Sequence, residues 1–457
     1  MSNKNPFIIN KYCVFSALLL LIKQLIVATS TLWIVKMGQN LNDPHGFILY
    51  FCLFASSLIV VYIPGALSSY FLDLSVFKSF QRYIERFNNN HYGNAALSRD
   101  SAYKKQHEPY LVNEGMSVIN ELHSFYSNYL EIAVNIVLSI FTLSYLIDEN
   151  LLIAYTISII LVTSIILLFS PKIKQAASKA QTSRVNLVQV LTQQWDNVLI
   201  GNQKNYSIWH KHFKMLLGNS KETKVKNTLW VEFSTTIASL IGFIPIIYFL
   251  LDTITEAAND IALLTALIAT LPRQITTVHY LSDIAFFSNE YTALKARING
   301  LKTSLVLNPS HTKATISWDK ITLSNTLLQP SFSQQALDLE DLIATLSHQK
   351  TGRYLVSGTN GCGKSSMLLQ LKESLKENAY YLPANSDLFF DNAMENNFSS
   401  GEKQVNALHN LRTLKGVQYL LLDEWDANLD NNNKQLLSTL LDKLSLSYCI
   451  LEVRHHQ

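Results

Sequence analysis

Charged residues are scarce in this chain, and the scarcity is uneven. Asp, Glu, Lys and Arg make up 16% of its 457 residues, against roughly a quarter in a typical soluble domain. The shortfall is concentrated in the first two-thirds of the sequence, which indicates membrane-spanning segments there. The net charge is only +3, so the composition does not favour nucleic acid as a partner.

Cysteine is also rare, and its distribution argues against a disulfide scaffold or a zinc site. The four cysteines lie far apart, without the spacing of metal ligands. We therefore expect reduced thiols that behave as small apolar side chains. They are Cys13, Cys52, Cys362 and Cys449.

Long apolar stretches dominate the first 300 residues. A bilayer core of about 30 Å requires about 20 mostly apolar residues in a helix, and six stretches qualify. Any one of them could be a buried helix of a soluble protein, but six at this spacing predict an all-α membrane domain over residues 1–305. The first has no convincing cleavage site before or after it, so we expect it to be retained. The stretches are residues 12–36, 47–69, 126–147, 150–170, 229–252 and 260–286.

The loops between these stretches differ in length and charge. The short connections at 37–46, 148–149 and 253–259 contain no Lys or Arg, whereas the loops at 70–125 and 171–228 contain six and ten. The positive-inside rule therefore predicts that the long loops and both termini are cytoplasmic. Helical patterning within the long loops suggests that the spans continue as helices beyond the membrane. We expect turns near Tyr92–Arg99 and Gly201–Tyr206, the alternative being ordinary solvated amphipathic loops.

Two cations lie inside predicted spans. Lys23 is midway along the first, and Arg273 follows Pro272 in the sixth, where the proline should kink or interrupt the helix. A charge in hydrocarbon costs several kcal/mol, so each cation should face a water-filled cavity or a partner. One interpretation is a cargo cavity that favours anionic groups. The alternatives are structural pairing with Glu131 or Asp283, or snorkelling.

The last third of the sequence has a different pattern. A predicted strand at residues 353–357 leads into the sequence G-x-x-x-x-G-K-S, and a helix follows over residues 365–378. In that context the glycines let backbone N–H groups surround a phosphate at a helix N-terminus. Lys364 should reach the β- and γ-phosphates, and the Ser365 hydroxyl should ligate Mg²⁺. The residues expected to bind nucleotide here are Gly358, Thr359, Asn360, Gly361, Cys362, Gly363, Lys364, Ser365 and Ser366.

A second predicted strand, residues 418–422, ends in two acidic residues. An apolar strand of this kind is typical of a buried parallel sheet that presents carboxylates at its C-terminal edge. Asp423 is the expected Mg²⁺ ligand, and Glu424 is expected to orient and activate the attacking water. The alternative is a strand end with two solvated acids.

Three further segments resemble those of ATP-binding cassette proteins. Phe398–Gln404 resembles that family's signature sequence LSGGQ, with Phe in place of Leu and Ser400 in place of the first Gly. Asp426–Asp430 resembles the D-loop, and the strand 449–453 leads to His455, in the position of the switch histidine. Together with the glycine loop and the Asp-Glu strand, these motifs cover residues 315–457 in the family's order. Residues 1–305 resemble its six-span exporter type in topology only.

The resemblance implies a membrane all-α domain plus an α/β P-loop NTPase domain at 310–457, with ATP and Mg²⁺ as cofactors. In this family the P-loop of one subunit and the signature of another enclose one ATP, so one chain cannot complete a site and a homodimer completes two. The catalytic residues are then Glu424 and His455. The nucleotide contacts from across the interface are Ser399, Ser400, Gly401, Glu402 and Asp430.

This sequence departs from the family pattern in three places. The region between Ser365 and Ser399 is much shorter than the family's helical insertion. Where the family has Tyr-x-Pro-Gln, this chain has Tyr381–Ala384, so the glutamine that contacts Mg²⁺ is missing unless Asn385 replaces it. Trp318 is the nearest candidate for the aromatic residue that stacks on adenine.

The sequence therefore predicts an ATP hydrolase coupled to transport, in the bacterial inner membrane, with its ATPase domain in the cytoplasm. The expected activity is export of a peptide or small natural product by a homodimer. One alternative is an importer on the same scaffold. Another is a membrane sensor or immunity protein that binds ATP without transporting anything, which the short insertion and missing glutamine favour.

Overall fold

The computed structural model describes ten segments, and the chain forms two compact units. Unit 1 comprises Met1–Glu85 and Tyr110–Thr303, and unit 2 comprises Arg86–Pro109 and Ser304–Gln457. Each unit is described by itself. The described residues are 9–256, 260–307, 316–325, 333–335, 338–348, 350–384, 388–389, 400–414, 416–427 and 429–454.

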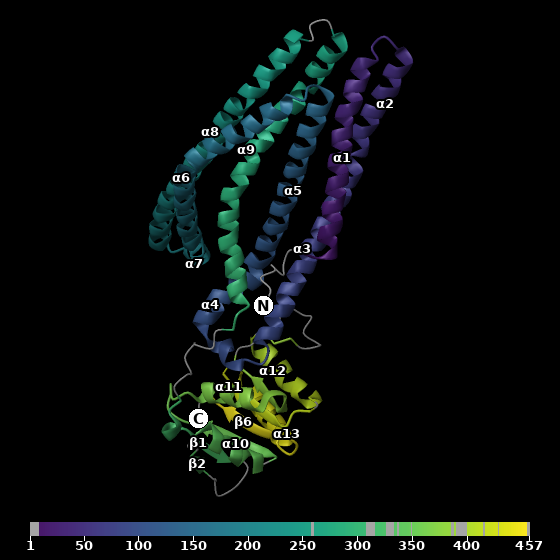
Figure 1. Cartoon of the computed structure of the whole chain (residues 1–457). Coiled ribbons are helices and arrows are strands. Elements are labelled where there is room, and N and C mark those ends of the chain that lie inside the picture. Colours follow the sequence, from purple (N-terminus) through teal and green to yellow (C-terminus); the bar gives the residue numbers. More distant parts are fainter. Residues whose placement is uncertain are drawn as a thin grey trace. The chain divides into compact units, whose positions relative to one another are not determined.

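Unit 1 is built from long helices (Figure 1). Among the described residues, six helical segments are long and apolar enough to span a membrane. Each of the six predicted stretches overlaps one of them, with ends that agree to within a few residues or lie inside the helix. The prediction of six helices of this length and composition is therefore confirmed. The helices, with the part of α3 that continues into unit 2, are α1 (Lys11–Gln39), α2 (Pro44–Val60), α3 (Tyr62–His91), α5 (Gly115–Leu146), α6 (Leu151–Leu191), α7 (Gln194–Leu199), α8 (Gln203–Glu256) and α9 (Ile261–Ser304).

The second span is interrupted between α2 and α3. Pro64 has no N–H group, so the carbonyl of Val60 loses its helical donor and the helix breaks at Val61. In contrast, Pro272 lies inside the continuous helix α9. Of the two effects expected of Pro272, an interruption of the sixth span is therefore wrong, and a kink stays a prediction. No residue of α2 is buried within the chain, as expected for a helix that faces lipid.

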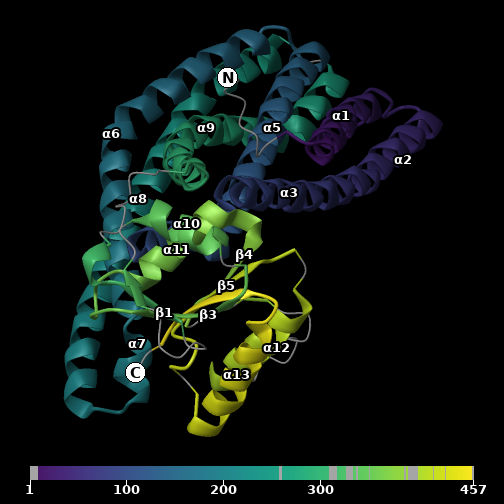
Figure 2. The same ribbon diagram turned by 90° about the horizontal axis from the view of Figure 1, so that it is seen from below.

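Helices α6 and α8 lie side by side in unit 1 (Figures 1 and 2). They approach closely at Gly242, where an added Cβ would lie 2.5 Å from Val162 Cγ2. The Ser158 hydroxyl donates to the Gly242 carbonyl at 2.6 Å. Only glycine allows the two backbones to come this close, and the buried hydroxyl finds an acceptor there.

Both predicted turns lie where expected. Helix α3 ends at His91 and is followed by a 3₁₀ turn, η1 (Ala95–Arg99). Gly201 has φ +77° between α7 and α8, a backbone conformation that favours glycine.

Unit 2 contains a six-stranded mixed sheet. Its strands are ordered β2-β1-β3-β6-β5-β4, with β1 antiparallel to both neighbours and the other pairs parallel. Every residue of β5 and β6 is buried, as expected for central strands covered on both faces. The strands are β1 (Thr322–Asn325), β2 (Ser333–Gln335), β3 (Gly352–Ser357), β4 (Ala379–Leu382), β5 (Tyr419–Asp423) and β6 (Cys449–Val453).

Helices cover both faces of this sheet (Figure 2). On one face α10 (Leu339–His348) and α11 (Lys364–Leu375) bury Leu342, Leu346 and Met367 against the strands. On the other face α12 (Ser400–Asn410) and α13 (Asn431–Leu444) form a second apolar core around Leu408, Leu420 and Leu441. The result is a three-layer α/β arrangement in which the carboxyl ends of the parallel strands share one edge.

Residues 86–109, from the first long loop, belong to unit 2. This segment includes η1 and the short helix α4 (Ser101–Pro109). Asn90 donates to the Leu305 carbonyl at 2.7 Å, and the Ala96 N–H donates to Glu373 on α11 at 2.9 Å. The sequence had suggested a simple division near residues 305–310, but the compact α/β unit also includes this loop.

Candidate functional site

The glycine-rich loop lies between β3 and α11, as predicted. Gly361 and Gly363 have φ of +81° and +98°, which other residues adopt only with strain. Gly358 is required for a different reason, since an added Cβ would lie 2.6 Å from the Lys320 carbonyl oxygen. The loop therefore depends on all three glycines.

Helix α11 begins at Lys364 without a side-chain cap, because Gly363 occupies its N-cap position. Its first N–H groups have no partner within the helix, and they add to the positive end of the helix dipole. The Lys364 ammonium group donates to the carbonyl oxygens of Gly358 and Thr359 at 2.8 and 3.4 Å. Positive charge is thus concentrated around the loop, which suits an anion.

Ser365 and Asp423, the two predicted magnesium ligands, are in direct contact. Asp423 ends β5 and is fully buried, and its Oδ1 accepts a hydrogen bond from the Ser365 hydroxyl at 2.9 Å. A hydroxyl and a carboxylate are oxygen donors of the kind that Mg²⁺ prefers. The two residues therefore fit the ion that the sequence implied.

Two residues that the sequence analysis did not assign to the site contact the other oxygen of Asp423. The Tyr381 hydroxyl donates to Asp423 Oδ2 at 2.9 Å. Arg99 NH1 lies 3.2 Å from the same oxygen. Burial, together with the charge and hydrogen bond of Asp423, raises the pKa of Tyr381 well above its usual range, so Tyr381 remains a hydrogen-bond donor at neutral pH.

Glu424, the predicted base, has an unusual backbone conformation. Its φ is +48°, which costs a non-glycine residue about 1–3 kcal/mol. Its N–H donates to the Val453 carbonyl on β6 at 2.9 Å, and the next residue, Trp425, is buried. The bond to Val453 and the buried Trp425 thus fix the backbone of Glu424 at the edge of the sheet, directly after Asp423.

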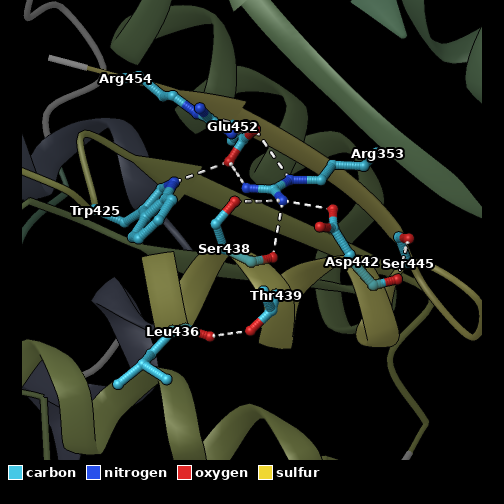
Figure 3. A network of polar contacts seen from close by, with 9 residues as sticks. All are labelled: Arg353, Trp425, Leu436, Ser438, Thr439, Asp442, Ser445, Glu452 and Arg454. Carbon is cyan, nitrogen blue, oxygen red and sulfur yellow. Dashed lines mark hydrogen bonds and ion pairs between the residues drawn. The ribbon is translucent and has the colours of Figure 1, made fainter. Parts of the chain in front are cut away.

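A buried ion-pair network lies behind this edge (Figure 3). The Arg353 guanidinium on β3 donates to Glu452 on β6 through Nε at 3.1 Å and NH2 at 2.8 Å. Its NH1 reaches Asp442 on α13 at 2.7 Å. The Trp425 indole N–H donates to Glu452 at 2.9 Å, and Arg454 also pairs with that carboxylate at 2.8 Å.

The network holds two residues at this edge: Trp425, shortly after Asp423, and Arg454, directly after β6. Burial alone would lower the pKa of Arg353, but the carboxylates of Glu452 and Asp442 outweigh it and raise that pKa. The cation is therefore retained inside the unit. The sequence did not predict this network, because no local pattern distinguishes its residues, which come together only when the strands pair.

Other predicted site residues have local structural roles or lie outside the described residues, and their predicted nucleotide contacts stay predictions. Asp430 caps α13, accepting the Asn433 N–H at 2.7 Å. Trp318 packs partly buried against the core of unit 2. Ser400, Gly401 and Glu402 form the first turn of α12. The expectations for Ser399, His455 and Asn385 lie outside the described residues.

In unit 1 the two intramembrane cations are joined by a polar chain. Lys23 pairs with Glu131, so for this residue the predicted structural pairing is confirmed. Gln24 also donates to Glu131, at 3.2 Å, and accepts from Asn135 at 2.7 Å.

The chain continues to Arg273 through Ser139. The Ser139 hydroxyl donates to Asn135 at 3.3 Å and accepts from Arg273 NH2 at 3.1 Å, while Arg273 NH1 donates to the Val27 carbonyl at 2.8 Å. Among the described residues, Arg273 has no carboxylate within ion-pair distance, and its buried Nε has no hydrogen-bond partner. Its predicted pairing with Glu131 or Asp283 is therefore wrong.

A cavity of about 230 Å³ lies beside this polar chain. Its walls come from α1, α5 and α9 and combine amide, carboxylate and aromatic side chains. The lining residues that matter are Gln24, Asn128, Glu131, Asn135, Tyr280 and Phe287. Such a lining offers both hydrogen-bond donors and acceptors within an apolar bundle.

Comparison of the sequence with models of protein families gives no match. Comparison with curated proteins gives none either.

Proposed function

We propose that the chain is one half of an ATP-driven transporter in a bacterial inner membrane, with unit 2 in the cytoplasm. The observation that carries this proposal is the contact between Ser365 and Asp423 at 2.9 Å. It lies at the carboxyl edge of parallel strands, directly beside a glycine loop that opens a helix. Ligands of α/β sheets bind at this edge.

The residues divide the chemistry of ATP hydrolysis among them. Loop N–H groups and Lys364 would neutralise the phosphates. Ser365 and Asp423 would hold Mg²⁺, which supplies charge neutralisation when bound. Glu424 would accept a proton from the attacking water. A second copy of the chain would supply the signature residues around Gly401 and close the site.

Unit 1 offers a place for cargo. The cavity beside Glu131 and Asn135 suits a polar group, and Arg273 adds an unneutralised cation nearby. A small peptide or modified natural product with a carboxylate would satisfy both features. Replacing Arg273 with Gln should then weaken transport of such cargo, whereas Arg184→Gln, on an exposed part of α6, should not.

The test is ATP turnover and cargo accumulation in proteoliposomes made with the full chain. We expect Glu424→Gln to abolish both while retaining nucleotide binding, and Glu340→Gln, an exposed control on α10, to retain both. Uptake that persists in Glu424→Gln would contradict the proposal. Nucleotide binding without turnover in the wild type would instead indicate the sensor alternative, and cargo loading from the outer face would indicate an importer.

A further inference from the structure

A basic pocket lies between α6 and α8, where both helices change from apolar to charged. The stretch 151–170 on α6 has no charged residue, and Lys172 is the first charge after it. On α8 the predicted span begins at residue 229. The pocket is therefore at the level expected for one membrane–water interface.

Three of the seven residues that line this pocket are lysines. Its volume is about 270 Å³. On α6 the lining positions are i, i+3, i+4 and i+7, and on α8 they are i, i+3 and i+7, so each helix presents one face. The lining residues are Lys172, Gln175, Lys179, Thr223, Lys226 and Trp230, with Ala176 between them.

No carboxylate of the described residues lies within ion-pair distance of the three lysines. The surrounding loop has little compensating charge, with two acidic residues against ten Lys and Arg over residues 171–228. Three ammonium groups around one pocket repel one another. A bound anion would remove that repulsion.

Trp230 indicates that the pocket lies at the level of the lipid headgroups. The Lys172 ammonium lies 4.9 Å from the centroid of its ring, and Phe169 and Phe233 contact the ring at centroid distances of 6.3 and 6.4 Å. Tryptophan is enriched at the level of lipid headgroups, because its ring is apolar and its N–H is polar. Basic pockets between spans on the cytoplasmic side recognise anionic headgroups.

We propose that Lys172, Lys179 and Lys226, with Trp230, bind the phosphate headgroup of an anionic phospholipid. The ammonium groups pair with the phosphate oxygens, and the Gln175 side-chain amide can donate a further hydrogen bond. The rings of Phe169, Trp230 and Phe233 pack against the part of the acyl chains nearest the headgroup. This proposal depends on the six spans and does not depend on ATP hydrolysis.

The experiment measures lipid retained by the full chain after transfer into detergent, using native mass spectrometry. The chain is first placed in nanodiscs of phosphatidylcholine with or without phosphatidylglycerol. The test variant carries Lys172→Gln, Lys179→Gln and Lys226→Gln. Its matched control carries Lys204→Gln, Lys211→Gln and Lys214→Gln, which removes the same charge from the same hairpin outside the pocket.

We expect the wild type and the control to retain phosphatidylglycerol in preference to phosphatidylcholine. Each lysine near an anionic surface should strengthen binding roughly fivefold, so the test variant should retain less by a factor of tens or more. Replacing the same three lysines with arginine should preserve retention, since the charge remains. Circular dichroism and gel filtration establish that all variants are folded.

Three outcomes would overturn the proposal. Equal loss in the test variant and the control would show diffuse attraction to the loop. Equal retention of neutral lipid would indicate an apolar groove. Displacement of phosphatidylglycerol by millimolar inorganic phosphate would indicate a site for soluble anions.

Discussion

Replacing Glu452 with glutamine removes one negative charge from a fully enclosed position. Glu452 is 0% exposed and its partner Arg353 is 2% exposed. Neutralising one member of a buried ion pair costs about 3–5 kcal/mol, because the other charge stays buried without compensation. Arg353 retains Asp442 at 2.7 Å and the Ser438 hydroxyl at 3.0 Å, so we expect a value near the lower limit, about 3 kcal/mol.

A loss of this size should be visible in thermal unfolding of unit 2. For a domain of about 150–250 residues, 1 kcal/mol corresponds to about 2–4 °C, so Glu452→Gln should lower the melting temperature by roughly 6–12 °C. The assay is scanning fluorimetry of the purified chain, in which Trp425 reports on the network. The exposed control Glu340→Gln should stay within about 1 °C of the wild type.

A double variant separates the ion pair from other effects. Arg353→Met combined with Glu452→Gln leaves no unpaired charge between strands β3 and β6. Its destabilisation should be smaller than the sum of the two single variants by at least about 1 kcal/mol. Additive losses, or a Glu452→Gln variant as stable as Glu340→Gln, would refute the reasoning.

Three further predictions concern other parts of the chain. Lys23→Leu should destabilise unit 1 because it leaves the Glu131 carboxylate unpaired, and the added change Glu131→Leu should recover most of the loss in a thermal assay. Arg99→Gln should strengthen magnesium-nucleotide binding about two- to fivefold in a fluorescence titration, because the half-exposed Arg99 guanidinium is screened by solvent and its pair with buried Asp423 contributes about 1 kcal/mol. The same titration in EDTA should show no difference between Arg99→Gln and the wild type. Burial raises the pKa of the Cys449 thiol to about 12, so at pH 8 a water-soluble maleimide should label it only as fast as unit 2 unfolds. Rapid labelling of the folded chain, or weaker nucleotide binding by Arg99→Gln, would contradict these arguments.

Local patterns were sufficient to predict the long apolar helices and three of the strands of the fold. The apolar runs gave the six spans, and the strand predicted at 449–453 coincides with β6 (Cys449–Val453). The predicted strand 418–422 differs from β5 by one residue, because Asp423 pairs with Val453 and extends the strand. Such helices and strands are determined mainly by residues close together in the sequence, so a single sequence is enough to predict them.

Contacts between distant segments could not be predicted in the same way. Ser365 and Asp423 were each predicted to bind magnesium, but their direct contact was not. It arises because β3 and β5 bring their carboxyl ends to the same edge of the sheet. Nothing local distinguishes Arg353 or Glu452 from any other charged residue at a strand. Their partnership follows only from the register that places Tyr354 opposite Leu451 between β3 and β6.

Arg99 and Tyr381 contact Asp423 at the edge of the candidate site where the sequence resemblance would place a glutamine. That glutamine would follow β4, which ends at Leu382, and at this edge the Asp423 carboxylate accepts from Tyr381 and pairs with Arg99. Arg99 belongs to the segment between α3 and α5, and both helices carry candidate spans. A guanidinium and Mg²⁺ compete for the same carboxylate oxygens. If Mg²⁺ bound Asp423 as proposed, it would therefore weaken the contact of that carboxylate with Arg99, and the Arg99→Gln titration tests this competition.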